Sequence, residues 1–203
     1  MDFDIIHEYK NHTELYDETV RNYYDNRILV VNEDINEFLL DDVTLHILKW
    51  NQEDRGLSAK SRKPIKIYID SGGGSVLCAN NLIDIIKVSK TPVYAVAFSL
   101  VASAASSIYI ACDKRYAFDS SVFLLHDGSL QVSNSSNKAK DTMKFFDKMD
   151  DKTREFLLSN TKITEEEYEE SKDRELYMFS SEAKEKGIVD KIVGKDCSLD
   201  EIL

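Results

Sequence analysis

The stretch of sequence that decides the fold lies between residues 67 and 76 and reads Ile67-Tyr68-Ile69-Asp70-Ser71-Gly72-Gly73-Gly74-Ser75-Val76. Its first half continues an alternating pattern that begins after Pro64 and is typical of a β-strand. From Val76 to Ser89 apolar residues recur at helical spacing, which predicts a helix directly after the glycines. Residues without a Cβ let another chain or an anion approach backbone N–H groups, so we expect a binding site at this strand-to-helix turn.

Two further segments follow in order along the chain. Pro92 precedes an apolar strand over residues 93–98, after which the chain reads Ser99-Leu100-Val101-Ala102-Ser103-Ala104-Ala105. Ser103 therefore lies where a strand becomes a helix of small residues, which exposes its hydroxyl near the first amides of that helix. The third segment, Leu124-Leu125-His126, ends a core-like strand with a histidine. Active sites of open α/β folds gather at the carboxyl ends of such strands.

Together these segments hold the parts that acyl transfer needs: a nucleophile, a base and donors for an oxyanion. Ser103 is the candidate nucleophile, and His126 is the candidate base. The other histidines do not end a core-like strand; they are His7, His12 and His46. Each candidate also has a structural explanation, because serines between alanines pack helices and glycine triplets form turns. On the residues alone, the catalytic and the structural explanations are evenly matched.

The glycines do not indicate a phosphate-binding loop. They do not follow the GxGxxG pattern, and no Lys-Ser or Lys-Thr pair comes after them.

Composition argues against several classes of function. The chain has 203 residues, a net charge of −11 and a pI near 4.9, so we expect neither nucleic acid nor an anionic membrane as a partner. No apolar run reaches the ~18 residues of a membrane span, and the start of the chain lacks the pattern of a signal peptide. We therefore expect a cytoplasmic location. The three cysteines are widely separated, without metal-site spacing, so neither a metal nor a cofactor is expected.

Repeated strand-then-helix units predict an α/β fold with a largely parallel sheet. The first unit combines a strand over residues 27–31 with helical spacing from Ile35 to Leu48. The remaining predicted strands cover residues 115–118, 122–125 and 188–193.

A long amphipathic helix is predicted from about Ser135 to Ser159. A second helix begins near Thr164 with a capping box, and a third covers residues 181–186 before Gly187. We divide the chain into an irregular N-terminal arm, a head domain, a projecting helical region and a C-terminal return to the head; these parts cover residues 1–26, 27–134, 135–175 and 176–203.

Four blocks of the sequence resemble the Clp protease proteolytic subunit family, whose members are serine peptidases of the ClpP/crotonase fold. Residues 67–76 resemble its Tyr-Ile-Asn-Ser-Pro-Gly-Gly-Ser-Val block, and residues 99–105 resemble its Gly-Met-Ala-Ala-Ser-Met-Gly nucleophile segment. Residues 123–126 resemble its Met-Ile-His, and residues 178–190 are similar to its Ser-Ala-Glu-Glu-Ala-x-x-Tyr-Gly-Leu-Ile-Asp. The resemblance covers residues 16–193 and places the family's handle helix at residues 135–160.

Carried over by position, the resemblance implies a complete catalytic set. Ser103 is then the nucleophile and His126 the general base, with the oxyanion donors at the amides of Gly73 and Ala104. The third triad position of the family aligns with Glu175, although an aspartate is usual there. Asp173 or a backbone group is an alternative for that position.

The resemblance also implies that a peptide substrate is held as an added strand between two segments. The residues implied in this binding are Gly74, Ser75, Val76, Asp127, Gly128 and Ser129. Gly72 replaces the family's proline, and residues 127–129 differ from the Gln-Pro-x-Gly-Gly that usually follows the histidine. These departures leave the nucleophile and base in place and the substrate preference open.

The expected activity is that of a ClpP-like serine endopeptidase that cleaves unfolded polypeptides inside an oligomeric ring chamber. The resemblance implies two stacked heptameric rings supplied by an ATP-dependent AAA+ unfoldase. One alternative is a catalytically silent subunit of such a ring. Another is an acyl-CoA enzyme of the related crotonase fold, which would need neither Ser103 nor His126.

Overall fold

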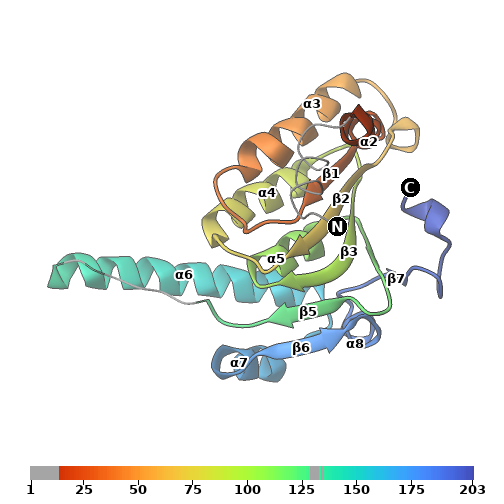
Figure 1. The fold of residues 1–203 in the computed structure, drawn as a ribbon. Helices are drawn as coiled ribbons and strands as arrows, with labels where there is room; N and C mark the ends of the chain where they lie inside the picture. Colours follow the sequence, from red (N-terminus) through yellow and green to blue (C-terminus); the bar gives the residue numbers. More distant parts are fainter. Residues whose placement is uncertain (1–13, 129–132, 134) are drawn as a thin grey trace, which may run out of the picture.

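A largely parallel β-sheet organises the molecule (Figure 1). The structure, a computed structural model, describes residues 14–128, 133 and 135–203. The strands are β1 (Ile28–Val31), β2 (Ile65–Ser71), β3 (Val93–Ala102), β4 (Lys114–Ala117), β5 (Val122–Leu125), β6 (Leu176–Phe179) and β7 (Lys191–Ile192). Strands β1, β2, β3, β4 and β7 are neighbours in that order and run parallel. The prediction of a largely parallel α/β fold is confirmed.

Helices separate most of the strands along the chain. They are α2 (Glu14–Asp25), α3 (Leu45–Glu53), α4 (Val76–Val88), α5 (Ala104–Ala111), α6 (Ser136–Asn160), α7 (Glu165–Asp173) and α8 (Ser180–Glu185). Short helical turns cover Leu40–Thr44, Ala59–Ser61 and Leu199–Glu201. In the part of the chain that the structure describes, no helix is long and apolar enough to cross a membrane.

The side chains of β2 alternate between two hydrophobic clusters on opposite faces of the sheet. Ile65, Ile67 and Ile69 are buried in the main core, with residues of α3, α4 and α5. Tyr68 belongs to a smaller cluster on the other face of the sheet. The side chains of a strand alternate between faces, so the pattern read from the sequence places each residue correctly.

Strand β3 brings the predicted site segments to one edge. Its first half pairs with β4 through Tyr94–Ala97, and its second half pairs with β5 through Leu100–Ala102. Because β2, β3 and β5 are parallel, their carboxyl ends lead into the glycine segment, Ser103 and His126, respectively. Three segments far apart in sequence therefore end at neighbouring positions.

Helix α6 projects from the rest of the structure (Figure 1). Its 25 residues span about 37 Å at 1.5 Å per residue. Its buried residues, Met149 and Leu157, lie in its C-terminal half. Met143 and Phe145 are exposed in the projecting half.

The structure corrects three boundaries. Residues 14–25 form helix α2, although an irregular arm was predicted there; residues 1–13 lie outside the described part of the chain. Strand β3 continues to Ala102, because residues 99–102 join it to the end of β2 and to β5. The last strand is shorter than predicted, since only Lys191–Ile192 pairs with β4.

Candidate active site

Ser103 occupies a strained position between β3 and α5. Its φ of +54° and ψ of −126° are unusual for a residue with a side chain, and such strain persists only when the surroundings enforce it. The Ser103 N–H donates to the Leu124 carbonyl oxygen at 2.9 Å. The Ser106 hydroxyl is 2.8 Å from the Val101 carbonyl oxygen and 3.1 Å from that of Leu124. These bonds tie the turn to β3 and to the end of β5.

The hydroxyl of Ser103 is left available by this arrangement. Ser103 is the N-cap residue of α5, yet its side chain makes no capping hydrogen bond. The Ala104 N–H lies in the first turn of that helix and makes no hydrogen bond within the described residues. A nucleophile at a sharp strand-to-helix turn, beside a free helix amide, is the arrangement of a nucleophile elbow.

Gly73 packs directly against this elbow. A Cβ on Gly73 would lie 2.6 Å from the Ser103 Cβ and 2.7 Å from the Ala102 carbonyl oxygen, and 3.1 Å from the Ala104 nitrogen. The φ of Gly73 is +98°. Both the space and the backbone conformation therefore require glycine at this position.

The amides of the glycine segment differ in their partners. The Gly73 N–H, assigned to the oxyanion from the sequence, donates to Ser71 Oγ at 3.2 Å in this structure. The Gly73 carbonyl accepts from the Ile35 N–H at 2.8 Å, and the Ser75 N–H donates to the Ile35 carbonyl at 2.7 Å. Within the described residues, the N–H and carbonyl of Gly74 make no hydrogen bond. The N–H and carbonyl of Gly74 are thus available for hydrogen bonds, and we call them the unoccupied edge of this segment.

His126 follows β5 and is exposed. The antiparallel ladder between β5 and β6 ends with Leu125 opposite Leu176, so its next register pair is His126 and Glu175. The nearby Glu175 carboxylate raises the pKa of Tyr177. Between the described atoms of Ser103 and His126 the structure contains no hydrogen bond.

The other predicted site residues are placed as follows. Asp127 and Gly128 are exposed after His126, and the Asp127 N–H donates to the Ser171 carbonyl at 3.3 Å. Ser129 lies outside the described residues, as does the side chain of Asp173. Among the competing histidines, His46 lies on α3 with its Nδ1 at 3.2 Å from the Tyr24 hydroxyl, away from this site.

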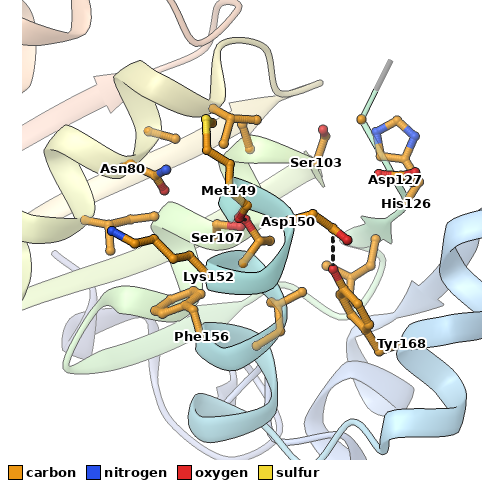
Figure 2. A pocket seen from close by; sticks show the side chains of 18 of the residues that line it. Asn80, Ser103, Ser107, His126, Asp127, Met149, Asp150, Lys152, Phe156 and Tyr168 are labelled. Atoms are coloured by element: carbon orange, nitrogen blue, oxygen red, sulfur yellow. Dashed lines mark hydrogen bonds between the residues drawn. The ribbon is translucent and has the colours of Figure 1, made fainter. Parts of the chain in front are cut away.

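A cavity of about 530 Å³ adjoins Ser103 and His126 (Figure 2). Residues of α4, α5, α6 and α7 line it, and its walls combine apolar with polar and charged side chains. On one wall the Tyr168 hydroxyl donates to Asp150 Oδ1 at 2.7 Å, and Lys172 Nζ lies 3.2 Å from Asp150 Oδ2. Burial, together with this hydrogen bond, raises the pKa of Tyr168 well above its ordinary value. This volume is typical of a ligand-binding site.

Sequence reasoning missed two parts of the site. The hydrogen bonds of Ser71 and Ile35 depend on how the glycine turn folds back, which no local pattern reveals. The cavity walls come from helices that are up to about 100 residues apart, so only tertiary packing brings them together.

Fold and site together define an α/β protein with a strained serine, free backbone amides and a histidine at one edge of a parallel sheet. The sequence profile of the Clp protease family matches residues 11–196. The chain therefore belongs to the Clp protease family.

Individual relatives agree with this assignment. The chain is 29% identical to the ATP-dependent Clp protease proteolytic subunit 2 of Treponema denticola over 187 residues, which cover 91% of the chain and 90% of the relative. It is 28% identical to the ATP-dependent Clp protease proteolytic subunit 3 of Rhizobium johnstonii, with 87% of this chain and 88% of that one covered. Among solved structures, a mutant of ClpP1 from Listeria monocytogenes matches with a TM-score of 0.70 and 26% identity, covering 91% of this chain and 99% of that one.

Proposed function

We propose that this chain is a serine endopeptidase of the ClpP type, with Ser103 as nucleophile and His126 as general base. The observation that carries the proposal is the strained Ser103 turn, with Gly73 packed against it and a cavity beside it. A residue held in an unfavourable conformation at the mouth of a cavity is typical of an active site. Family membership adds independent support.

The proposed reaction proceeds in two steps. His126 takes the proton of the Ser103 hydroxyl as the serine oxygen bonds to the carbonyl carbon of the peptide, and the resulting oxyanion accepts hydrogen bonds from backbone amides. The tetrahedral intermediate collapses to an acyl-enzyme as His126 protonates the leaving amine. Water then attacks the ester, again with His126 as base, which releases the acid and restores Ser103.

We assign the oxyanion donors to Ala104 and Gly74. The Ala104 N–H is free in the first turn of α5, where the helix dipole favours negative charge. Gly74 replaces the sequence-based choice of Gly73, whose N–H donates to Ser71 in this structure.

The unoccupied edge at Gly74 supports binding of the substrate as an added strand. Ser75 and Val76 continue this edge into α4, although the Ser75 N–H is already bonded to Ile35. Asp127 and Gly128, exposed beyond β5, would flank the other side of the peptide. Ser129 keeps its proposed role in this second segment from the sequence alone.

Glu175 remains our proposal for the group that orients His126. The β5–β6 register places these two residues opposite each other once the ladder is extended by one pair. The carboxylate also interacts with Tyr177, whose pKa it raises, so Tyr177 would compete with His126 for it.

The relatives support a proposal about the assembly and the partners of this chain. Those named above are proteolytic subunits of an ATP-dependent Clp protease. We propose that this chain likewise forms stacked rings of identical subunits, seven in each, and receives unfolded polypeptides from an AAA+ unfoldase. The exposed apolar residues of the projecting helix α6 support an assembled state, because burying such side chains against another subunit removes them from water.

Cleavage of an unstructured polypeptide labelled with a quenched fluorophore tests the activity. The native chain should release fluorescence, and both Ser103→Ala and His126→Ala should lower kcat/KM by at least about a thousandfold. Ser198→Ala, at an exposed serine near the C-terminus, is the matched control and should cleave normally. Equal cleavage by Ser103→Ala would contradict the proposed nucleophile.

A second candidate is a catalytically silent ring subunit. The absence of a hydrogen bond between the described atoms of Ser103 and His126 supports this candidate, and membership of the Clp protease family favours it over the acyl-CoA alternative. In a purified homo-oligomer of assembled size it predicts no cleavage at all.

A further inference from the structure

The cavity beside Ser103 is lined by apolar, charged and uncharged polar side chains, and two of the uncharged polar ones lie on the helices that follow the glycine segment and Ser103. Asn80 comes from α4 and Ser107 from α5, two helices that pack against each other (Figure 2). Both residues are half-buried. Around them the walls are formed by Val76, Ala79, Ile83, Ala104 and Met149.

Neither polar group has a partner in the described part of the chain. No hydrogen bond reaches the Asn80 amide or the Ser107 hydroxyl there, although other helical serines such as Ser106 are fully engaged. The one fully buried and unpaired side-chain atom among the described residues is Nη1 of Arg115. The polar atoms of Asn80 and Ser107 are therefore open to the cavity and available to an occupant.

Each group lies about one turn into its helix. Ser107 is four residues after Ser103 on α5, and Asn80 is four residues after Val76 at the start of α4. Four residues make about one helical turn, or roughly 5.4 Å along the axis. An extended glutamine or methionine side chain also reaches about 5 Å from its Cα, given bonds of about 1.5 Å. A side chain of this length therefore spans about one helical turn.

The charges around the cavity do not favour an ionised occupant. Asp150 is neutralised by Lys172 at 3.2 Å and bonded to Tyr168, and Lys172 is also 3.1 Å from Glu169. Lys87 lies over the Phe156 ring, 4.4 Å from its centre. Apart from Asp150 and Lys172, the charged residues on the helical walls are exposed and balance in sign; they are Asp84, Lys87, Asp147 and Lys152. The helical walls therefore have no excess of one charge that would favour an ionised occupant over a neutral one.

We propose that Asn80 and Ser107 select substrates with glutamine on the acyl side of the cleaved bond, in preference to the equally long but apolar methionine. The proposal rests on the peptidase function proposed above. The glutamine amide both donates and accepts, which matches the Asn80 amide and the Ser107 hydroxyl. Methionine would leave both groups without partners and displace the water that hydrates them.

Paired fluorogenic peptides that differ only in this residue test the proposal. The native chain should cleave the glutamine peptide with a kcat/KM about tenfold higher than that of the methionine peptide, the effect expected of two partly exposed hydrogen bonds. In Asn80→Leu combined with Ser107→Ala the ratio should invert. Because the ratio is measured within one preparation, it does not depend on the fraction of folded protein. Asn81→Leu, on the exposed side of α4, is the matched control and should keep the native ratio.

The outcomes separate the two proposals. Cleavage of both peptides with methionine equal or preferred overturns the role of Asn80 and Ser107 and leaves the peptidase function intact. An unchanged preference for glutamine in the double variant also overturns that role. If neither peptide is cleaved by assembled native protein, the peptidase function fails and this specificity fails with it.

Discussion

At the scale of single residues, the site depends on backbone conformations that side-chain chemistry then exploits. Ser103 and Gly73 both have a positive φ, and the Ser103 turn occupies the space that a Cβ on Gly73 would need. The two positions are complementary, because a side chain on Gly73 would occupy the place of the Ser103 turn. Strain at Ser103 is thus enforced by its neighbour Gly73 across the strand ends.

Gly73→Ala should disrupt this fit. The new Cβ would lie 2.6 Å from the Ser103 Cβ, so the turn must move, and we expect a loss of about 1–3 kcal/mol in the free energy of unfolding. Peptidase activity should fall by more than the loss of folded protein accounts for. Gly72→Ala is the control, since a Cβ there meets nothing within 4 Å and its φ is not positive. Denaturant unfolding and peptide cleavage measure the two effects, and equal behaviour of both variants would refute the account.

Glu175 provides a second test at this scale. Glu175→Gln should lower kcat/KM by about 10²-fold or more if this carboxylate orients His126, whereas Asp173→Asn should cleave peptides normally. Tyr177→Phe removes the hydroxyl that interacts with Glu175 and should leave cleavage unchanged or faster. Normal cleavage by Glu175→Gln with loss in Asp173→Asn would transfer the orienting role to Asp173.

Sequence patterns predict the types of residue at the site better than their hydrogen bonds. Ser103 and His126 could be found because each follows an apolar strand, and topology brings such strand ends together. The sequence led to the Gly73 amide as an oxyanion donor and could not reveal that this N–H donates to Ser71 Oγ, because that bond forms only in the folded turn. For the same reason the link between Glu175 and Tyr177 was not predicted.

At the scale of elements, a buried ion pair joins three parts of the fold, the segments just before β1, after α3 and just before β3. Arg27 at the start of β1 bonds Asp54 after α3 through Nη1 at 2.7 Å and Nη2 at 2.9 Å. The hydroxyl of Thr91, just before β3, donates to the same carboxylate at 2.9 Å. The side chains of Arg27 and Asp54 are only 13% and 6% exposed, so removing one partner leaves the other desolvated and unpaired.

Asp54→Asn should lower the free energy of unfolding by about 3 kcal/mol. Glu53→Gln is the matched control: its carboxylate lies 3.8 Å from the same guanidinium but is 48% exposed, so a change below about 1 kcal/mol is expected. Denaturant titration at neutral pH measures both. Equal stability of Asp54→Asn and the native chain would show that the pair does not hold these elements together.

The same pair predicts a pH dependence. The hydrogen bonds from Arg27 hold the pKa of Asp54 below its ordinary value of 3.8. A carboxylate with a lowered pKa binds fewer protons in the folded state than in the unfolded state, so its contribution is complete above pH 3.8 and lost as the pH falls through the folded value. The difference in stability between the native chain and Asp54→Asn should therefore shrink in acid.

The elements themselves were largely predictable, and the errors have local causes. Helix α4 and the Thr164 capping box agree with their sequence signals, which are short-range. Helix α2 was missed because its 12 residues are polar on average, although their apolar residues do follow a helical period, and β3 was cut short because Ser99 interrupts its apolar run.

At the scale of the whole molecule, the projecting helix is the feature that a single chain explains least. Met143 and Phe145 are 55% and 51% exposed on α6, where nothing in the described chain covers them. Within the proposed rings, another subunit would cover this half of the helix. Exposed apolar area on a projecting helix is otherwise a liability for aggregation.

Replacing both residues, as Met143→Glu with Phe145→Glu, should reduce the assembled mass. Light scattering after size exclusion should detect particles of about half the native mass or less, since charges placed in an apolar contact are costly. Lys144→Glu changes the charge of an exposed residue between them and should assemble normally. An unchanged mass in the double variant would exclude this part of α6 from the contact.

The central claim is that Ser103 is a nucleophile activated in this fold, and covalent labelling tests it most directly. A fluorophosphonate should add to the assembled native chain at a single serine, which peptide mass spectrometry should locate at Ser103. Ser103→Ala should abolish the label and Ser198→Ala should retain it. No labelling of the assembled native chain, or labelling that persists in Ser103→Ala, would contradict the account.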